Sequence, residues 1–216
     1  MQVLVTGGLG YIGSHTSVLL LEKGYDLVIV DDLSNSNEKV IENISQITSK
    51  VPVFEKIDLK DKESVSKLFN NYDFDGIIHF AAHKSVNESV NYPDKYFKNN
   101  VGSLENIIYE IQKLKKPMNF IFSSSCTVYG QADSMPINED FELKKAESPY
   151  GQSKRKCEEI LENFHKTRHN FKNITLRYFN PIGAHPTSLI GELPIGIPEN
   201  LVPYITQTAV GKRDHL

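Results

Sequence analysis

A glycine-rich turn near the amino terminus constrains the fold of this chain more than any other stretch. Residues 2–6 form a short apolar run, typical of a strand that is covered on both faces. The sequence GGLGYIG of residues 7–13 follows at once, and an apolar helical pattern then continues to Gly24, a natural helix end. Glycines at such a junction allow a tight turn and a close approach between a pyrophosphate and the N–H groups that begin the helix. The spacings Gly8-x-Gly10-x-x-Gly13 and Gly7-x-x-Gly10-x-x-Gly13 both predict a dinucleotide site.

An acidic pair after the second apolar run supports this prediction. Residues 26–30 lead into Asp31 and Asp32, and Asp31 lies 18 residues past Gly13. An acid at that distance accepts hydrogen bonds from the adenosine ribose hydroxyls. Because a carboxylate there would repel a 2′-phosphate, the sequence favours NAD over NADP. The alternative is that both aspartates only cap the strand.

Further apolar runs alternate with helical patterns along the chain and predict an α/β fold, a doubly wound parallel sheet of the Rossmann type. In such sheets ligands bind outside the carboxyl ends of the strands. The expected strands are 51–54, 76–82, 118–122 and 174–179, and the expected helices are 34–50, 61–69, 88–115 with a break at Pro93, 150–168 and 200–210. The residues expected on one rim are the glycine turn, Asp31, Asp58, Ala81, Lys84 and Ser125.

Two polar residues on this rim have alternative interpretations. Asp58 follows the third strand and either reaches the adenine amino group or caps the next helix. His83 follows the fourth strand and is either catalytic or, more commonly for a lone loop histidine, structural.

Ser125 ends the fifth strand, and Tyr150 and Lys154 stand four residues apart at the start of a helix, on one face. We expect the lysine ammonium to lower the pKa of the tyrosine, which makes the phenolate a general base for a sugar or alcohol hydroxyl. Ser125 could hold the same hydroxyl. The alternative is a surface helix with a solvent-directed lysine.

Composition excludes several classes of function. The net charge is −3 and basic residues are dispersed, so nucleic acid is not an expected partner. The two cysteines, Cys126 and Cys157, have no metal-binding spacing and suggest a reducing compartment, with Cys157 on the buried side of its helix. The first residues lack the pattern of a targeting segment, and no apolar run is long enough for a membrane span. We therefore expect a soluble cytoplasmic protein without a metal.

The motifs TGGLGYIGSH, VDDLSNS, HFAAHKSVNESV, SSSCTVYG, SPYGQSK, LRYFNPIGAHP and GIPENLVPYI together resemble the extended short-chain dehydrogenase/reductase family over essentially all 216 residues. Within that family the chain is similar to the members that epimerise UDP-hexoses at C4. The resemblance implies bound NAD and an interconversion of UDP-glucose and UDP-galactose through a 4-keto intermediate. It also implies a homodimer formed through the two long helices.

The resemblance assigns roles residue by residue. Tyr150 is the base, Lys154 holds its charge and the nicotinamide ribose, and Ser125 contacts the 4-hydroxyl. Asp32 stands where many members have Asn, and its carboxylate further disfavours NADP. The positions matched to the cofactor are Gly7, Gly10, Tyr11, Ile12 and Gly13 at the pyrophosphate, Asp31 at the adenosine ribose, Asp58 and Leu59 beside adenine, Phe80, Ala81, Lys84 and Asn99 along the cofactor, and Phe179 near the nicotinamide. The positions matched to the nucleotide sugar are Ser125, Tyr150, Asn180, Asn200 and Leu201.

Length separates this chain from the family, whose members are considerably longer. We expect residues 1–180 to form the NAD-binding domain and 181–216 to begin a nucleotide-sugar domain, the rest of which supplies further UDP contacts. The chain by itself is then expected to bind NAD and to epimerise poorly or not at all. One alternative is a nucleotide-sugar dehydratase of the same fold, but the stretch Ser125-Cys126-Thr127-Val128 lacks the Asp-Glu pair that such enzymes carry. Another is a non-catalytic NAD sensor, which has no need of Tyr150 and Lys154.

Overall fold

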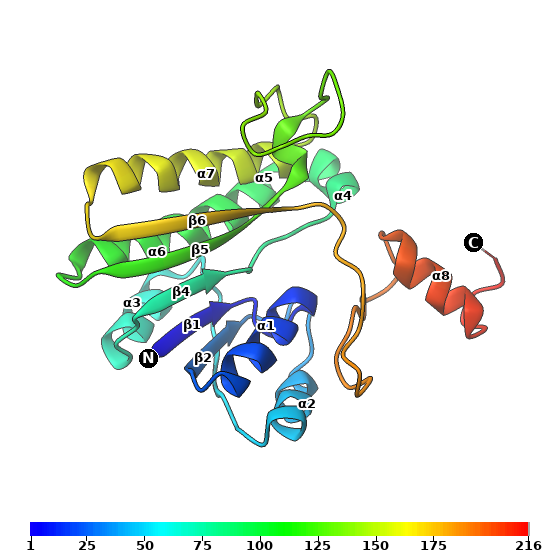
Figure 1. Cartoon of the computed structure of the whole chain (residues 1–216), viewed down its shortest axis with the longest axis horizontal. Coiled ribbons are helices and arrows are strands. Elements are labelled where there is room, and N and C mark those ends of the chain that lie inside the picture. The colour runs from blue at the N-terminus through cyan, green and yellow to red at the C-terminus, as the bar shows by residue number, and fades with distance from the viewer. Residues whose placement is uncertain (216) are drawn as a thin grey trace.

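The computed structural model describes residues 1–215 and consists of one parallel sheet with helices on both faces (Figure 1). The strand order is β3-β2-β1-β4-β5-β6, and every neighbouring pair is parallel. This arrangement confirms the predicted doubly wound fold and places all carboxyl ends of the strands on one rim. The strands are β1 (Gln2–Thr6), β2 (Asp26–Asp31), β3 (Val53–Lys56), β4 (Gly76–His79), β5 (Met118–Ser125) and β6 (Phe171–Tyr178).

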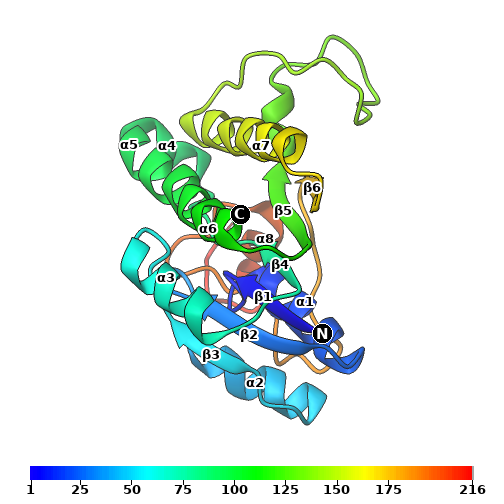
Figure 2. The ribbon, with the colours of Figure 1, turned by 90° about the vertical axis from the view of Figure 1, so that its left-hand side faces the viewer.

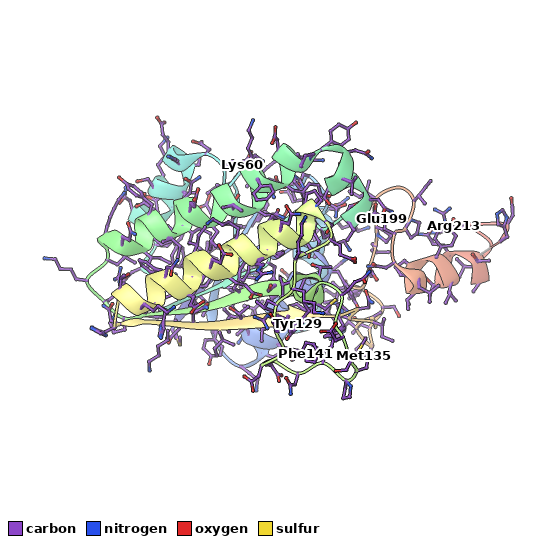
Figure 3. All side chains as sticks on the ribbon, turned by 90° about the horizontal axis from the view of Figure 1, so that it is seen from above. Lys60, Tyr129, Met135, Phe141, Glu199 and Arg213 are labelled. Atoms are coloured by element: carbon purple, nitrogen blue, oxygen red, sulfur yellow. The ribbon has the colours of Figure 1, made fainter. Side chains whose placement is uncertain are left out.

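Alternate residues of the central strands point into two separate cores, as the pleat of a strand requires. Leu4 packs with α3, α6 and α7 on one face, while Val3 and Val5 pack with α1 and α2 on the other. Figures 2 and 3 show α6 and α7 side by side. The helical elements are α1 (Tyr11–Glu22), α2 (Lys39–Thr48), α3 (Lys62–Asn71), α4 (Val86–Asn91), α5 (Pro93–Tyr96), the π-helical turn η1 (Phe97–Val101), α6 (Gly102–Lys113), the 3₁₀ turn η2 (Cys126–Tyr129), α7 (Pro149–Thr167) and α8 (Leu201–Ala209).

Several strand boundaries differ from those expected. β4 ends at His79 and not at Ala82. β3 begins two residues later than predicted, after Pro52, which has no N–H group to donate to a neighbouring strand. β5 continues through the serines to Ser125 because β6 pairs with it along its whole length. β6 begins earlier, at Phe171, and ends at Tyr178, so Phe179 follows the strand instead of closing it.

The long helical region is divided, as the sequence predicts, at Pro93. α4 begins at Val86, where the Ser85 side chain accepts a hydrogen bond from the Glu88 N–H group at 3.1 Å. The helix stops before Pro93, and α5 then starts with that proline in its first turn, where a missing N–H group costs nothing. The π-helical turn η1 was not predicted, and it widens the helix next to the rim of the sheet.

Residues 180–200, here called the crossing segment, run from the end of β6 past α1 and α2 to α8 (Figure 1). The Tyr11 hydroxyl donates to the Gly183 carbonyl at 2.8 Å, and the Asn43 amide donates to the Leu189 carbonyl at 2.8 Å. Ile190 is buried in the core beneath α1 and α2. The expected last helix is confirmed as α8, which stands apart from the sheet (Figure 1).

None of the helices within residues 1–215 combines the length and the apolar character that crossing a membrane would require.

A buried histidine in β4 gives the first prediction. Burial lowers the pKa of His79 to about 3, so the folded chain keeps the imidazole neutral next to the Thr6 hydroxyl, 2.7 Å from Nδ1. The unfolded chain takes up this proton near pH 6.5, so folding stability falls as the pH drops below that value. Between pH 7 and 5 the free energy of unfolding should fall by about 2 kcal/mol more in the unaltered protein than in His79→Asn, measured by urea denaturation. Parallel pH profiles for the two proteins would contradict this.

Candidate active site

The glycine turn leaves no room for side chains at two of its positions. Gly7 adopts φ +65° and lies so close to the backbone after β4 that a Cβ atom would sit 2.6 Å from the Ala81 nitrogen. A Cβ atom on Gly13 would sit 2.2 Å from the Gly7 carbonyl oxygen. The turn is therefore closed against β4 and against its own helix, as the spacing of glycines predicts.

The start of α1 presents unpaired backbone donors at this turn. Gly10 precedes the helix without any side-chain cap, and the first turn holds no acidic residue. Within residues 1–215 the N–H groups of Tyr11, Ile12 and Gly13 donate no hydrogen bond. Unpaired N–H groups at a helix start attract anions, because they carry the positive end of the helix dipole.

Asp31 lies beside the same turn and is 8% exposed. Its carboxylate accepts hydrogen bonds from the Leu9 N–H at 3.2 Å, the Leu33 N–H at 3.0 Å and the Ser36 hydroxyl at 2.6 Å. It therefore ties the end of β2 to the glycine turn, a structural role that goes beyond the capping alternative. Asp32 accepts from the Ser34 N–H at 2.9 Å, and although burial opposes it, this hydrogen bonding holds the pKa of Asp32 below its ordinary value.

The structure after β3 excludes one of the two interpretations of Asp58. Asp58 is not the cap of the following helix: the Asp61 side chain accepts from the Glu63 N–H at 3.1 Å and caps α3. Asp58 instead accepts from the Lys60 N–H at 2.9 Å and pairs with the Lys60 ammonium at 3.1 Å. Leu59 is buried in the core.

The residues expected along the cofactor lie in the loop after β4 and within η1. Ala81 donates from its N–H to the Thr6 hydroxyl at 3.4 Å, and Phe80 packs against the core on the α1 side. Asn99 accepts from the Lys60 ammonium at 3.2 Å. The Lys84 ammonium extends to Glu192 of the crossing segment, with 3.4 Å between Nζ and Oε1.

Ser125, Tyr150 and Lys154 are all buried, with exposed fractions of 8%, 9% and 3%. Ser148 caps α7 by accepting from the Gly151 N–H at 3.1 Å, and a proline in the first helical position follows it. This cap fixes Tyr150 in the first turn and places Lys154 one turn later. The alternative of a surface helix with a solvent-directed lysine is wrong.

The expected tyrosine pKa is also wrong for this structure. Burial raises the pKa of Tyr150, and interaction with the Ser125 hydroxyl only partly opposes that effect. Lys154 donates to the Ser123 carbonyl at 2.7 Å and lies 5.0 Å above the Phe122 ring centre, and burial lowers its own pKa to about 8. Sequence spacing indicated which groups share a face, but burial decides the direction of both pKa shifts.

One residue of this region was missed. The buried Asn100 amide accepts from the His83 N–H at 2.8 Å and donates to the His83 carbonyl and to the Ser153 hydroxyl, each at 3.0 Å. Ser153 in turn donates to the Tyr150 carbonyl at 2.7 Å. Asn100 thus joins the loop after β4 to the first turn of α7. The available signal was an Asn-Asn pair interrupting an apolar helical stripe.

His83 takes part in this network through its backbone, which favours the structural interpretation. Its ring packs against Tyr96 with 5.6 Å between ring centres, and Tyr96 packs edge-on against Tyr150 at 6.3 Å. Burial lowers the pKa of the His83 ring.

Several of the expected contact residues are exposed, including those at the end of β6 and the start of α8. Phe179 is 59% exposed, Leu201 is 72% exposed, and Asn180 is also exposed. Asn200 donates to Glu192 at 2.5 Å, so Glu192 holds both Asn200 and Lys84. Beside it, the Ser85 hydroxyl donates to Glu199 at 2.5 Å; Figure 3 shows Glu199 between the sheet and α8.

Within the described residues no three His, Cys, Asp or Glu side chains are arranged to hold a metal ion. Cys157 is fully buried in the core, as predicted, and Cys126 is partly buried at the end of β5.

Known proteins share both the sequence and the fold. Residues 4–216 match the family described as GDP-mannose 4,6 dehydratase. The chain is 48% identical to the UDP-glucose 4-epimerase of Schizosaccharomyces pombe and 47% identical to that of Bacillus subtilis; the alignments cover 99% and 100% of the chain but 61% and 63% of those proteins. The chain thus spans about three fifths of the length of these relatives.

Solved structures give the same result. A UDP-glucose 4-epimerase from Bifidobacterium longum in complex with NAD+ and UDP superposes with a TM-score of 0.95 at 41% identity, over 99% of this chain and 63% of that one. An epimerase from Stenotrophomonas maltophila with bound NAD and formylated UDP-arabinopyranose has a TM-score of 0.94 at 44% identity, over the same shares.

Lys154 gives a prediction from its burial. Because the folded protein releases this proton near pH 8 and the unfolded chain near 10.5, the unfolded state binds more protons between these values. Stability therefore rises with pH across this window. Relative to Lys154→Met, the free energy of unfolding of the unaltered protein should increase by about 2 kcal/mol between pH 8 and 10, measured by chemical denaturation. A constant difference between the two proteins would mean that Lys154 titrates normally.

Proposed function

The chain belongs to the family described as GDP-mannose 4,6 dehydratase, and from that membership we propose that it carries the NAD-binding and proton-transfer residues of a UDP-glucose 4-epimerase. The proposed reaction interconverts UDP-glucose and UDP-galactose. The relatives and structures that bear this name cover the whole fold of the chain at 41–48% identity. Because the chain spans only part of their length, the reaction is proposed for the protein to which these residues belong.

One observation carries the proposal: two chemically different sites share the same rim of the sheet. The first is the row of unpaired N–H groups at Tyr11, Ile12 and Gly13, closed against β4 by Gly7. The second is the buried set Ser125, Tyr150 and Lys154 at the end of β5. An anion site and a general base on one rim are what a dinucleotide-dependent reaction of a hydroxyl requires.

The residues present fit NAD. The unpaired N–H groups of α1 would hold its pyrophosphate, and Asp31, beside the turn, would accept from the adenosine ribose. The paired carboxylates Asp31 and Asp32 disfavour a 2′-phosphate. We assign Gly7, Gly10, Asp58, Leu59, Phe80, Ala81, Lys84, Asn99 and Phe179 to the remaining cofactor contacts. NAD, when bound, supplies a reversible acceptor for the hydride on C4 of the sugar.

Residues of this chain are proposed to transfer the proton of the sugar 4-hydroxyl. Tyr150 takes the proton of the sugar 4-hydroxyl as a phenolate, and Ser125 orients that hydroxyl. Burial disfavours the charged phenolate, which is why the pKa of Tyr150 is raised and why forming the phenolate costs free energy. Lys154, one helical turn after Tyr150, is proposed to supply the cation; with a pKa of about 8 it remains mainly charged at neutral pH. Asn180, Asn200 and Leu201 are proposed to contact the nucleotide sugar from the crossing segment and α8.

The same fold serves dehydratases, as the family description itself indicates. Dehydration at C5 and C6 requires an acid and a base just after the strand-end hydroxyl, and η2 (Cys126–Tyr129) contains no carboxylate. The buried Ser125, Tyr150 and Lys154 also favour an enzyme over a non-catalytic NAD sensor, which needs no proton acceptor.

We further propose that the protein works in the cytoplasm as a homodimer. Two free cysteines suit a reducing compartment. The outer faces of the helices α6 and α7 offer the paired surface expected for a dimer, with Tyr109 of α6 59% exposed. Residues 181–216 are assigned to the start of the nucleotide-sugar domain.

Tyr150 provides the direct test of the proton acceptor. Tyr150→Phe removes the hydroxyl and keeps the ring that packs on Tyr96, so turnover of UDP-galactose should fall by at least about a hundredfold while NAD affinity stays nearly unchanged. Tyr92→Phe, at a ring that is 61% exposed and has no proposed role, is the matched control and should leave turnover intact. Steady-state epimerisation and calorimetric NAD titration measure the two effects. Normal turnover by Tyr150→Phe would refute the assignment.

Gly13 provides the test of the cofactor cradle. Gly13→Ala places a methyl group where only 2.2 Å separates it from the Gly7 carbonyl, so it must displace the turn and should weaken NAD binding at least about tenfold. Gly102→Ala, at a helical glycine with no atom within 4 Å of the added Cβ, controls for the substitution itself. Equal NAD dissociation constants for the two variants would count against the glycine turn as the pyrophosphate site.

A further inference from the structure

A partly buried ion pair joins α7 to β6 next to the end of β5. Glu158 of α7 and Arg177 of β6 pair twice, with 2.9 Å between Nη2 and Oε2 and 3.2 Å between Nε and Oε1. Their side chains are 11% and 21% exposed. The Ser124 hydroxyl donates a hydrogen bond to the same carboxylate, at Oε1. One carboxylate thus joins two strands and a helix.

Lys154 and Glu158 of α7 both hydrogen-bond to β5 immediately before Ser125. Glu158 lies four residues after Lys154 and therefore on the same side of α7. Lys154 donates to the Ser123 carbonyl, and Glu158 accepts from the Ser124 hydroxyl. Two consecutive residues of β5 are thereby attached to the helix that presents Tyr150.

The partner of Glu158 is itself held in place. Arg177 lies opposite Ser124 in the β5–β6 register, stacks 4.8 Å from the Tyr129 ring centre and donates to the Glu139 carbonyl at 3.3 Å. A bidentate pair of this kind has a defined geometry. An ion pair removed from water often stabilises a fold no better than apolar residues of similar volume. We therefore consider what the Glu158–Arg177 pair holds in place, and not how much it stabilises the fold.

We propose that Glu158 is a positioning residue: through Ser124 it fixes the end of β5, and thereby the distance from Ser125 to Tyr150. Glu158 does not contact the substrate. This inference rests on the proposed function, since it assigns a purpose to the separation between Ser125 and Tyr150. Small displacements of a reacting group reduce the catalytic rate strongly, so loosening the separation between Ser125 and Tyr150 should lower kcat.

A double-mutant cycle tests the connection. Ser124→Ala deletes the hydrogen bond and leaves the ion pair, whereas Glu158→Leu removes both. Each variant should lower kcat about tenfold with KM within about twofold, and the double variant should be no worse than the poorer single one. Hydrogen exchange of the amides of residues 123–127 should accelerate about tenfold in each, because the strand end is released.

Two controls separate positioning from general destabilisation. Glu162→Leu makes the same change in an exposed pair of α7, with Lys166, and should alter neither readout. Leu161→Val weakens the buried core of the same helix and should leave exchange at residues 123–127 and kcat close to normal. Additive effects of the two substitutions, or an equal effect of Leu161→Val, would overturn the proposal. If the unaltered chain shows no turnover, as its length leads us to expect, the exchange comparison alone decides the role of Glu158, whereas a failure to bind NAD would count against the proposed function.

Discussion

The close contact between the glycine turn and the backbone after β4 is the constraint on which the rest of the site depends. Gly7 donates from its N–H to the Val30 carbonyl at 2.7 Å, and Phe80 donates to the Thr6 carbonyl at 3.0 Å, so three parallel strands meet at this point. No side chain fits between Gly7 and Ala81. Because the turn is closed in this way, the unpaired N–H groups of α1 face the rim, where the ends of the other strands also lie.

The second half of the site depends on how α7 is attached to β5. The Ser148 cap determines where the helix begins, and Lys154 and Glu158 attach it to consecutive strand residues. Burying Lys154 with the Ser123 carbonyl as its hydrogen-bond partner penalises its charge, which is why its pKa falls. In the proposed reaction this buried charge would favour the phenolate form of Tyr150.

Local spacing predicted much of this fold and part of the site. The glycine turn, Asp31 beside it and the shared helix face of Tyr150 and Lys154 follow from residue intervals within one strand-helix unit. Asn100 and Glu158 could not be found in that way, because their partners lie on other elements and become neighbours only in the folded chain. The direction of the Tyr150 pKa shift failed for a related reason, since burial is a property of the whole fold.

The most direct measurement is an assay of the nucleotide that purified protein releases on denaturation. A rim built from unpaired helix N–H groups and the carboxylates Asp31 and Asp32 predicts NAD, in an amount close to that of the protein, and no NADP. Release of NADP would contradict the role of the two carboxylates. Release of neither nucleotide, with no NAD retained after incubation and gel filtration, would contradict the dinucleotide site itself.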